Sequence, residues 1–175
     1  MTALLPYGIL AQLEAANQAV LVPMGGVQFA SFQQTRAIGT RGLGSCSVVV
    51  VASKYAAILA HIPPLPEQPS TNPFAGDENV REMMRQVRSL YDHYKQHNFF
   101  PDPDTYVVCA FFQGQVALPD QMEIMKRALQ EMGSSPRVRT YNVPVDRNRP
   151  GHGTVVVLSD QEEAKPVVYV EDQPI

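Results

Sequence analysis

Apolar side chains recur at intervals of three and four residues across residues 77–97, with polar side chains between them. This spacing places the apolar positions on one face of an α-helix, so we predict an amphipathic helix here. The opposite face carries Arg81, Arg85 and Arg88. We interpret these arginines as a solvated face without an assigned function, and an acidic ligand is the alternative.

Residues 119–132 show the same helical periodicity over a shorter length. Pro119 suits the first turn of a helix and Gly133 suits its end. We therefore predict a second helix whose inward face consists of Met122, Met125, Leu129 and Met132.

Short apolar runs that end in polar or turn residues predict β-strands elsewhere. Residues 47–53 are apolar on both faces, as expected for a strand buried between two layers, and residues 56–61 follow as the partner strand. Strands interleaved with two long helices indicate an α/β or α+β domain with a mixed sheet. Further strands are predicted at residues 20–23, 27–32, 106–112, 138–145, 153–160 and 165–172, and a short helix at residues 8–18.

The length of the chain, 175 residues, suits one domain with a sizeable core. We predict a single domain over residues 1–175, with an N-terminal extension at residues 1–20. Residues 62–76 are rich in proline, which forbids regular structure there. We interpret this segment as an extended surface crossing or a lid over the functional site rather than as a domain boundary.

The composition is 45% hydrophobic and 18% charged, with a net charge of −3, which is typical of a soluble globular protein. It gives no reason to expect nucleic acid as a partner. The apolar runs are far shorter than the roughly 20 residues that cross a bilayer, so we expect no membrane partner. Residues 1–35 contain no Lys or Arg, so the positively charged start of a secretory signal is missing. We therefore expect a cytoplasmic protein.

The chain has two cysteines, Cys46 and Cys109. Two are too few for a disulfide framework and match no zinc-ligand spacing, so we expect no structural metal. A reducing compartment disfavours a bridge between them. Cys109 lies in the middle of a predicted strand, where it is expected to pack as a small apolar side chain.

We assign no function to the remaining histidines or to the glycine pair at residues 42–44. His93 and His97 lie four residues apart on the first long helix, and no acidic residue joins them, so we expect exposed helix histidines. His152 lies between two glycines, and this pattern predicts a surface turn. The segment 42–44 opens a strand rather than a helix and fails the dinucleotide fingerprint. We expect a protein without a cofactor.

Cys46 and His61 are candidates for a catalytic pair. If the two central strands form a hairpin that turns at Ser53 and Lys54, Cys46 lies directly opposite His61. Opposed residues share a face with Cβ atoms about 4.5 to 5.5 Å apart, which lets a thiol and an imidazole form a hydrogen bond. A slip of one residue would send the two side chains to opposite faces.

The glycine-rich turn before Cys46 adds a second element of this chemistry. Its glycines permit backbone conformations that direct the N–H groups near Gly44 and Ser45 towards a substrate carbonyl oxygen, as an oxyanion hole does. Thr40, on the arm that enters the turn, can orient the ring of His61 through its hydroxyl or carbonyl group. The residue types also fit a structural alternative, in which Cys46 packs as a small apolar residue and His61 caps a sheet edge.

At these residues the sequence resembles the CheD family of bacterial chemoreceptor glutamine deamidases. The resemblance covers about residues 24–64. It implies a three-layer α/β/α sandwich with a mixed sheet, shared with a deamidating bacterial toxin and other cysteine hydrolases. It also implies Cys46 as nucleophile, His61 as general base and Thr40 as the orienting residue. The matching residues are Thr40, the turn Gly42-Leu43-Gly44-Ser45-Cys46, the strand Val48 to Val51, and His61-Ile62-Pro63.

The resulting hypothesis is a cysteine amidohydrolase that deamidates a glutamine side chain of a protein to glutamate and ammonia through a thioester. One alternative keeps the Cys46 and His61 pair but assigns it a small-molecule amide, ester or thioester. Another is a binding protein that retains the fold without catalysis. Reactivity of the Cys46 thiol separates the catalytic hypotheses from the last one.

Overall fold

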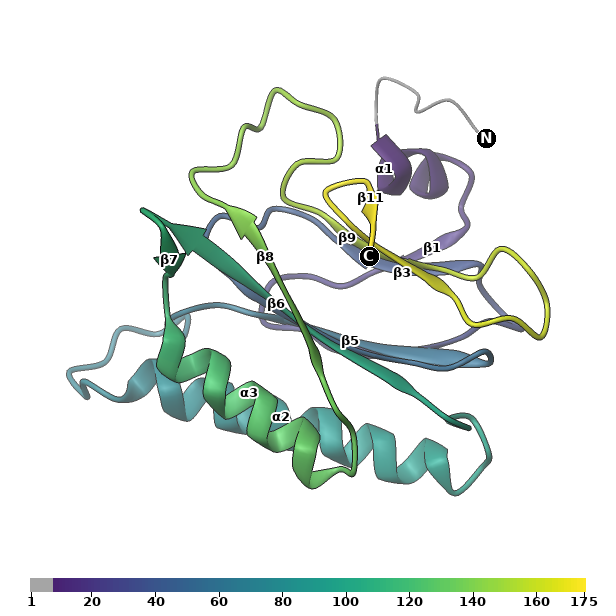
Figure 1. Ribbon diagram of the computed structural model, residues 1–175, viewed down its shortest axis with the longest axis horizontal. Helices are drawn as coiled ribbons and strands as arrows, with labels where there is room; N and C mark the ends of the chain where they lie inside the picture. The colour runs from purple at the N-terminus through teal and green to yellow at the C-terminus, as the bar shows by residue number, and fades with distance from the viewer. Residues whose placement is uncertain (1–7) are drawn as a thin grey trace.

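The computed structural model describes residues 8–175 (Figure 1). Its helices are α1 (Gly8–Ala15), α2 (Ala75–Lys95) and α3 (Pro119–Glu131). Its strands are β1 (Ala19–Leu21), β2 (Val27–Ser31), β3 (Ala37–Thr40), β4 (Ser47–Ala52), β5 (Ala56–Ile62), β6 (Asp104–Phe112), β7 (Gln115–Val116), β8 (Arg137–Asn142), β9 (Val155–Leu158), β10 (Val167–Val170) and β11 (Gln173–Pro174). The predicted mixed α/β class is confirmed.

The strands form two separate sheets. Sheet A has the order β1-β3-β9-β10-β11, in which β1 and β3 are parallel and the other pairs are antiparallel. Sheet B has the order β2-β5-β4-β6-β7, and β8 adds to β6 as a parallel neighbour. The hairpin predicted at the centre of the chain, β4 with β5, therefore lies in the middle of sheet B.

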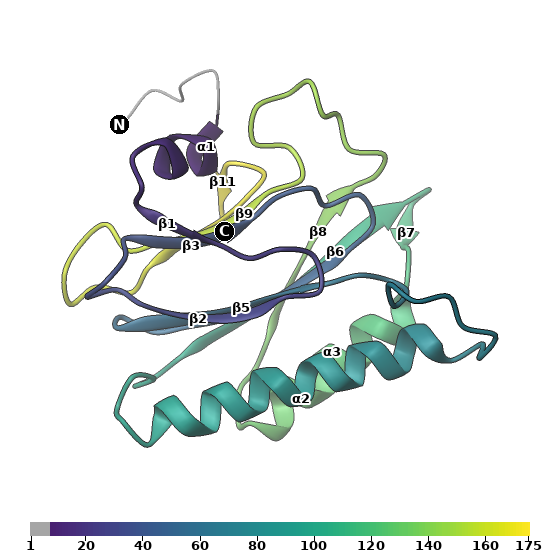
Figure 2. The ribbon, with the colours of Figure 1, turned by 180° about the vertical axis from the view of Figure 1, so that it is seen from behind.

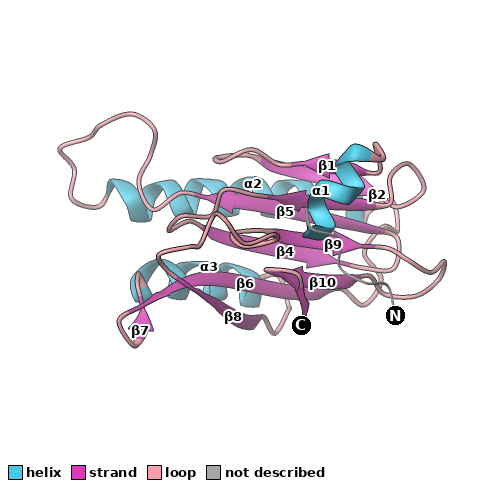
Figure 3. Ribbon diagram, turned by 90° about the horizontal axis from the view of Figure 1, so that it is seen from above, coloured by secondary structure: helices cyan, strands magenta, loops and turns pink. Residues whose placement is uncertain are grey.

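The two sheets face each other, and helices cover their outer faces (Figures 1 and 2). On sheet A, Leu10 and Leu13 of α1 pack with Ala37 and Val156. On sheet B, α2 and α3 pack over the far face with a core that includes Met83, Val87, Met125 and Leu129. In Figure 3, α1 lies in front of the strands and the two longer helices lie behind them. The order of layers is helix, sheet, sheet, helix.

Alternate residues of β4 serve the two cores. Val48 and Val50 point into the space between the sheets, whereas Val49 and Val51 point towards α2 and α3. All four are fully buried. Because both faces of the strand are covered, its sequence is a continuous apolar run rather than an alternating one. The prediction of a strand buried between two layers is confirmed.

The number of layers differs from the predicted three-layer sandwich with one mixed sheet. Strands near the two ends of the chain, β1 and β3 with β9 and β10, pair with each other instead of extending sheet B. Their apolar side chains then cover the face of sheet B that is turned away from α2 and α3. A second sheet thus replaces the expected helix layer on that face.

Most predicted elements are found near their predicted positions. Each bound of α2 differs by two residues from the predicted 77–97, and α3 ends one residue before the predicted 119–132. Strand β3 was not predicted, because its sequence, Ala-Ile-Gly-Thr, is short and contains a glycine. Residues 63–74 contain neither helix nor strand, as the prolines led us to expect.

The N-terminal extension predicted at residues 1–20 is described only from residue 8. Its described part contains α1 and the first two residues of β1, and both belong to the packed layers. Residues 1–7 lie outside the described residues.

Candidate active site

The three predicted catalytic residues come from two different sheets. Thr40 is the last residue of β3 in sheet A, and His61 lies near the end of β5 in sheet B. Cys46 precedes β4 directly and belongs to the core between the sheets. The candidate site is therefore built where the ends of the two sheets meet.

The register of the hairpin differs from the predicted one. His61 pairs with Val48, not with Cys46, and the loop consists of Lys54 and Tyr55. Ser53 causes the difference, because its hydroxyl accepts hydrogen bonds from the backbone N–H groups of Tyr55 and Ala56 and extends the ladder by one pair.

The register difference amounts to two residues, so it leaves Cys46 and His61 on the same side of sheet B. They are diagonal neighbours rather than a directly opposed pair, and diagonal Cβ atoms lie roughly 7 to 8 Å apart. Within residues 8–175, no hydrogen bond joins the thiol to the imidazole. A hydrogen bond between them requires a movement of at least one of the two side chains.

Thr40 and His61 are joined by a short hydrogen bond. The distance between Thr40 Oγ1 and His61 Nδ1 is 2.6 Å. Thr40 Oγ1 also donates to the carbonyl oxygen of Val22 at 2.7 Å. A hydroxyl has one hydrogen, so Thr40 accepts from Nδ1–H, and the ring has the tautomer with a bare lone pair on Nε2. The predicted orienting contact between Thr40 and His61 is present.

The other ring nitrogen of His61 has no partner. Nε2 is buried and forms no hydrogen bond with any described residue. The side chain is 1% exposed, and burial lowers the pKa of the imidazole below its ordinary value. An unsatisfied buried polar atom costs about 1 to 3 kcal/mol, so its retention calls for a reason such as catalysis. His61 is thus a neutral base with a free lone pair.

Cys46 is also buried, with 5% of its surface exposed. Burial raises the pKa of its thiol, and a backbone hydrogen bond at Ser45 opposes this in part. The thiol and the imidazole are therefore both neutral near pH 7, not a thiolate and imidazolium pair. A nucleophilic role for this sulfur would require transfer of its proton to a base.

The glycine-rich turn keeps one side open. Gly44 and Ser45 are exposed, and a Cβ atom on Gly44 would meet nothing within 4 Å. Leu43, by contrast, is buried, and its N–H donates to the carbonyl oxygen of Gly153 at 3.1 Å. The turn is anchored at Leu43 and accessible at the two residues predicted to supply oxyanion donors.

Two structural supports of the site were missed by sequence reasoning. The hydroxyl of Tyr141 on β8 donates to the carbonyl oxygen of Cys46 at 2.6 Å. Gly25 N–H donates to the carbonyl oxygen of His61 at 2.8 Å, and His61 N–H donates to Gly26 at 3.0 Å. The glycine pair was recognised as a turn, but nothing in the sequence indicates which strand that turn contacts.

The remaining candidates other than His152 lie away from this site. His152 lines a cavity together with Gly42 and Leu43 of the glycine turn. Cys109 belongs to the core beneath the helices, on the opposite face of sheet B from Cys46, and both cysteines are free. Burial raises the pKa of Cys109 to about 11. His93 is exposed on α2, as predicted, whereas His97 is exposed in the turn that follows the helix. His152 lies in a turn, as predicted, 3.8 Å from the carboxylate of Glu171.

Comparison with known proteins gives no relative from which a function can be transferred. No protein-family model matches the sequence. No curated protein matches it either. Across residues 8–175, no helix is both long and apolar enough to span a membrane.

Proposed function

We propose that the protein is a cytoplasmic cysteine amidohydrolase that deamidates glutamine side chains of a protein substrate. The resemblance of the segment from Thr40 to Pro63 to CheD proteins motivates this proposal. We further propose that the fold is a relative of the CheD sandwich. A reducing compartment keeps the Cys46 thiol available.

The observation that carries the proposal is the unpartnered Nε2 of His61. Thr40 occupies Nδ1 at 2.6 Å and leaves the lone pair of Nε2 free on the side of the sheet where Cys46 lies. A histidine with a structural role alone would be expected to satisfy both ring nitrogens in a buried site. General bases combine a fixed tautomer with a free lone pair near the nucleophile.

The reaction proceeds in two halves. In the first, Cys46 Sγ attacks the carboxamide carbon while its proton passes to His61 Nε2, and the N–H groups near Gly44 and Ser45 stabilise the oxyanion. Nε2 then returns the proton to the departing nitrogen, and ammonia leaves a thioester. In the second half, His61 takes a proton from water, and the hydroxide formed converts the thioester to glutamate and free Cys46.

The test is incubation with a glutamine-rich protein extract, followed by measurement of ammonia and of peptide masses. We expect ammonia release together with a mass increase of about one dalton at modified glutamines, since an amide becomes an acid. Cys46→Ser should abolish both signals, whereas Cys109→Ser is the matched control and should retain them. Full activity in Cys46→Ser, or no activity in the wild-type protein, would refute the proposal.

A cavity beside the glycine turn favours a second candidate, hydrolysis of a small acidic amide. The cavity has a volume of about 340 Å³ and is lined by Leu43 and by the basic side chains Arg41, Arg147 and Arg149, whereas Cys46 and His61 do not line it. Its size suits a metabolite with a carboxylate. Ammonia release from free glutamine or from an N-acylated glutamine, without a protein acceptor, would favour this candidate.

A further inference from the structure

Helices α2 and α3 lie on the side of the molecule opposite α1 and the loop at residues 143–153 (Figure 1). A groove runs between these two helices. The two helices pack side by side over sheet B. The groove has a volume of about 310 Å³. It is lined by Arg81, Met84, Arg85 and Arg88 from α2 and by Ile124, Arg127, Ala128 and Glu131 from α3. It shares no residue with the candidate active site.

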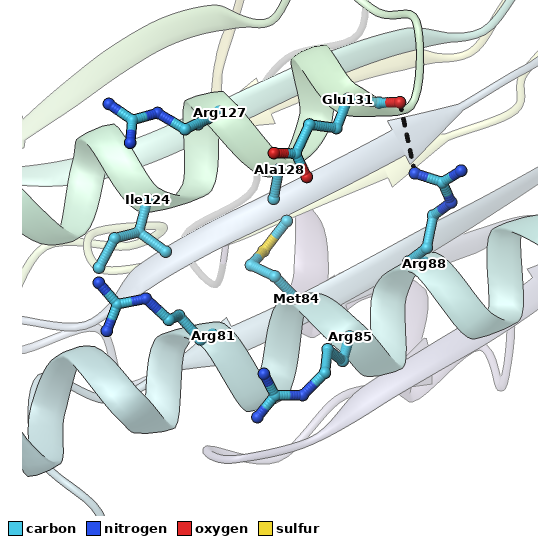
Figure 4. Close-up of a pocket in the computed structure, with 8 residues that line it drawn as sticks. All are labelled: Arg81, Met84, Arg85, Arg88, Ile124, Arg127, Ala128 and Glu131. Atoms are coloured by element: carbon cyan, nitrogen blue, oxygen red, sulfur yellow. Dashed lines mark hydrogen bonds between the residues drawn. The ribbon is translucent and has the colours of Figure 1, made fainter.

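The floor of the groove is apolar and its rims are basic (Figure 4). Met84, Ile124 and Ala128 lie between the helices, and two guanidinium groups flank Ile124, that of Arg81 from α2 and that of Arg127 from α3. Four arginines face one carboxylate, Glu131, along the lining. This local excess of positive charge contrasts with the net charge of −3 of the whole chain.

The four arginines differ in their partners. Arg85 pairs with Glu82 at 2.8 Å and Arg88 with Asp92 at 3.0 Å, both exposed pairs within α2. Such pairs contribute at most about 1 kcal/mol and are readily exchanged.

Arg88 also reaches across the groove, where its Nη1 donates to the carbonyl oxygen of Glu131 at 3.4 Å. For Arg81 and Arg127, no ion pair is found with any residue in the range 8–175. The end of the groove around Ile124 is therefore the place where a carboxylate from outside gains most.

We propose that this groove docks an acidic amphipathic helix of a partner protein. Apolar side chains of that helix would contact the half-buried Ile124 and Ala128, and its Asp or Glu side chains would pair with Arg81 and Arg127. An amphipathic helix that binds in an apolar groove is a recurring mode of protein recognition, and arginine is enriched in protein interfaces.

The position of the apolar floor distinguishes between a phosphate ion, a membrane surface and an acidic helix as ligands of the groove. A free phosphate has no apolar part to cover the floor. A membrane surface would be contacted first by protruding apolar side chains, yet Met84 is buried between the helices. An acidic helix supplies both a projecting apolar row and flanking carboxylates, so it complements the floor and the rims together.

The binding test uses a fluorescein-labelled peptide of about 15 residues, with one leucine row flanked by glutamates, a length that permits partial helicity. Two control peptides have the same composition in scrambled order, or lysine in place of glutamate. Fluorescence anisotropy at low ionic strength should give binding at least about tenfold tighter for the amphipathic acidic peptide than for either control.

Charge reversal locates the site. The double variant Arg81→Glu with Arg127→Glu should weaken binding of the acidic peptide by at least about tenfold. The double variant Arg81→Gln with Arg127→Gln removes the two charges without reversing them and should weaken binding less. The matched control, Arg137→Glu with Arg139→Glu, makes the same charge change at exposed residues of β8 that do not line the groove, and it should bind within about twofold of the wild-type protein. Circular dichroism checks that all variants fold.

Four outcomes would overturn the proposal. They are equal affinity for the scrambled peptide, equal loss in the two charge-reversed variants, binding to phosphatidylserine vesicles without binding to the peptide, and self-association in sedimentation that Arg81→Glu with Arg127→Glu abolishes. The last of these would assign the groove to a second copy of the chain. None depends on whether the protein hydrolyses amides.

Discussion

At the scale of single residues, the hydroxyl of Thr40 determines the tautomer of the neutral His61 ring. It donates to Val22 and accepts from Nδ1, so the proton of the neutral ring is held on the side away from the free Nε2. Thr40 does not reach the reacting atoms in this scheme. We therefore regard it as a positioning residue whose effect is exerted through His61.

Thr40→Val should lower kcat/KM by about 10- to 100-fold, since the variant keeps the shape of the side chain but removes the acceptor for Nδ1–H. Thr40→Ser should restore most of the activity. A purely structural role would give equal losses in both variants or none. The pH profile of Cys46 alkylation is the second readout, and it should change in Thr40→Val but not in Thr40→Ser.

The buried state of His61 makes a prediction about stability and pH. Because burial lowers the pKa in the folded protein, the unfolded chain binds a proton that the folded one does not when the pH falls below the ordinary value of 6.5. The free energy of unfolding should therefore fall as the pH decreases from 6.5, with a slope of up to about 1.4 kcal/mol per pH unit from this group.

Urea unfolding of the wild-type protein and of His61→Gln between about pH 7.5 and about pH 5, a window of about 2.5 units that spans the ordinary histidine pKa, isolates this contribution. The difference in unfolding free energy between the two proteins should shrink as the pH falls. If the difference in unfolding free energy stayed constant across this pH window, His61 would be protonated to the same extent in the folded and the unfolded state.

At the scale of elements, β3 is confined between its neighbours by Gly39. A Cβ atom at this position would lie 2.8 Å from Leu10 Cδ1 of α1 and 2.9 Å from the backbone oxygen of Val155 on β9. A methyl group there must displace the helix or the strand. Close packing thus requires a glycine in β3, and the same glycine is one reason why sequence analysis did not predict this strand.

Gly39→Ala should destabilise the protein by about 1 to 3 kcal/mol, measured by urea unfolding, because the contacted oxygen of Val155 belongs to the backbone. Gly44→Ala is the matched control. Nothing lies within 4 Å of its added Cβ atom, so its effect should stay within about 0.5 kcal/mol. Equal effects of the two substitutions would contradict the packing that we describe.

At the scale of the whole molecule, sheet B is the wall shared by both large cores. Its inner face packs against sheet A, and its outer face packs against α2 and α3. Loss of either core exposes the other face of the same strands. We therefore expect residues 8–175 to unfold as one cooperative unit, in keeping with the single domain predicted from length.

The two cysteines report this cooperativity, because Cys46 belongs to the core between the sheets and Cys109 to the core beneath the helices. In the Cys109→Ala variant, labelling of Cys46 in urea reports on the core between the sheets. In the Cys46→Ala variant, labelling of Cys109 reports on the core beneath the helices. The labelling midpoints, each compared with the circular dichroism midpoint of the same variant, should coincide. Separate midpoints would show two units.

Sequence reasoning located the long helices, the central hairpin and the residues of the candidate site. It placed Cys46 opposite His61, whereas Val48 occupies that position, because the hydroxyl of Ser53 makes the turn one residue later. It had no means of finding Tyr141, since β8 reaches Cys46 only through its parallel pairing with β6. The catalytic roles of Cys46, His61 and Thr40 stay predictions.

By itself, the sequence determined the long helices and most of the strands and which faces of them are buried, because apolar periodicity is a local property of the chain. Only the tertiary structure decided that the strands divide into two sheets, since pairing between β3 and β9 joins segments separated by most of the chain. The same long-range pairing brings Thr40 of one sheet onto His61 of the other. The free lone pair of His61 is therefore a product of the fold rather than of any local motif.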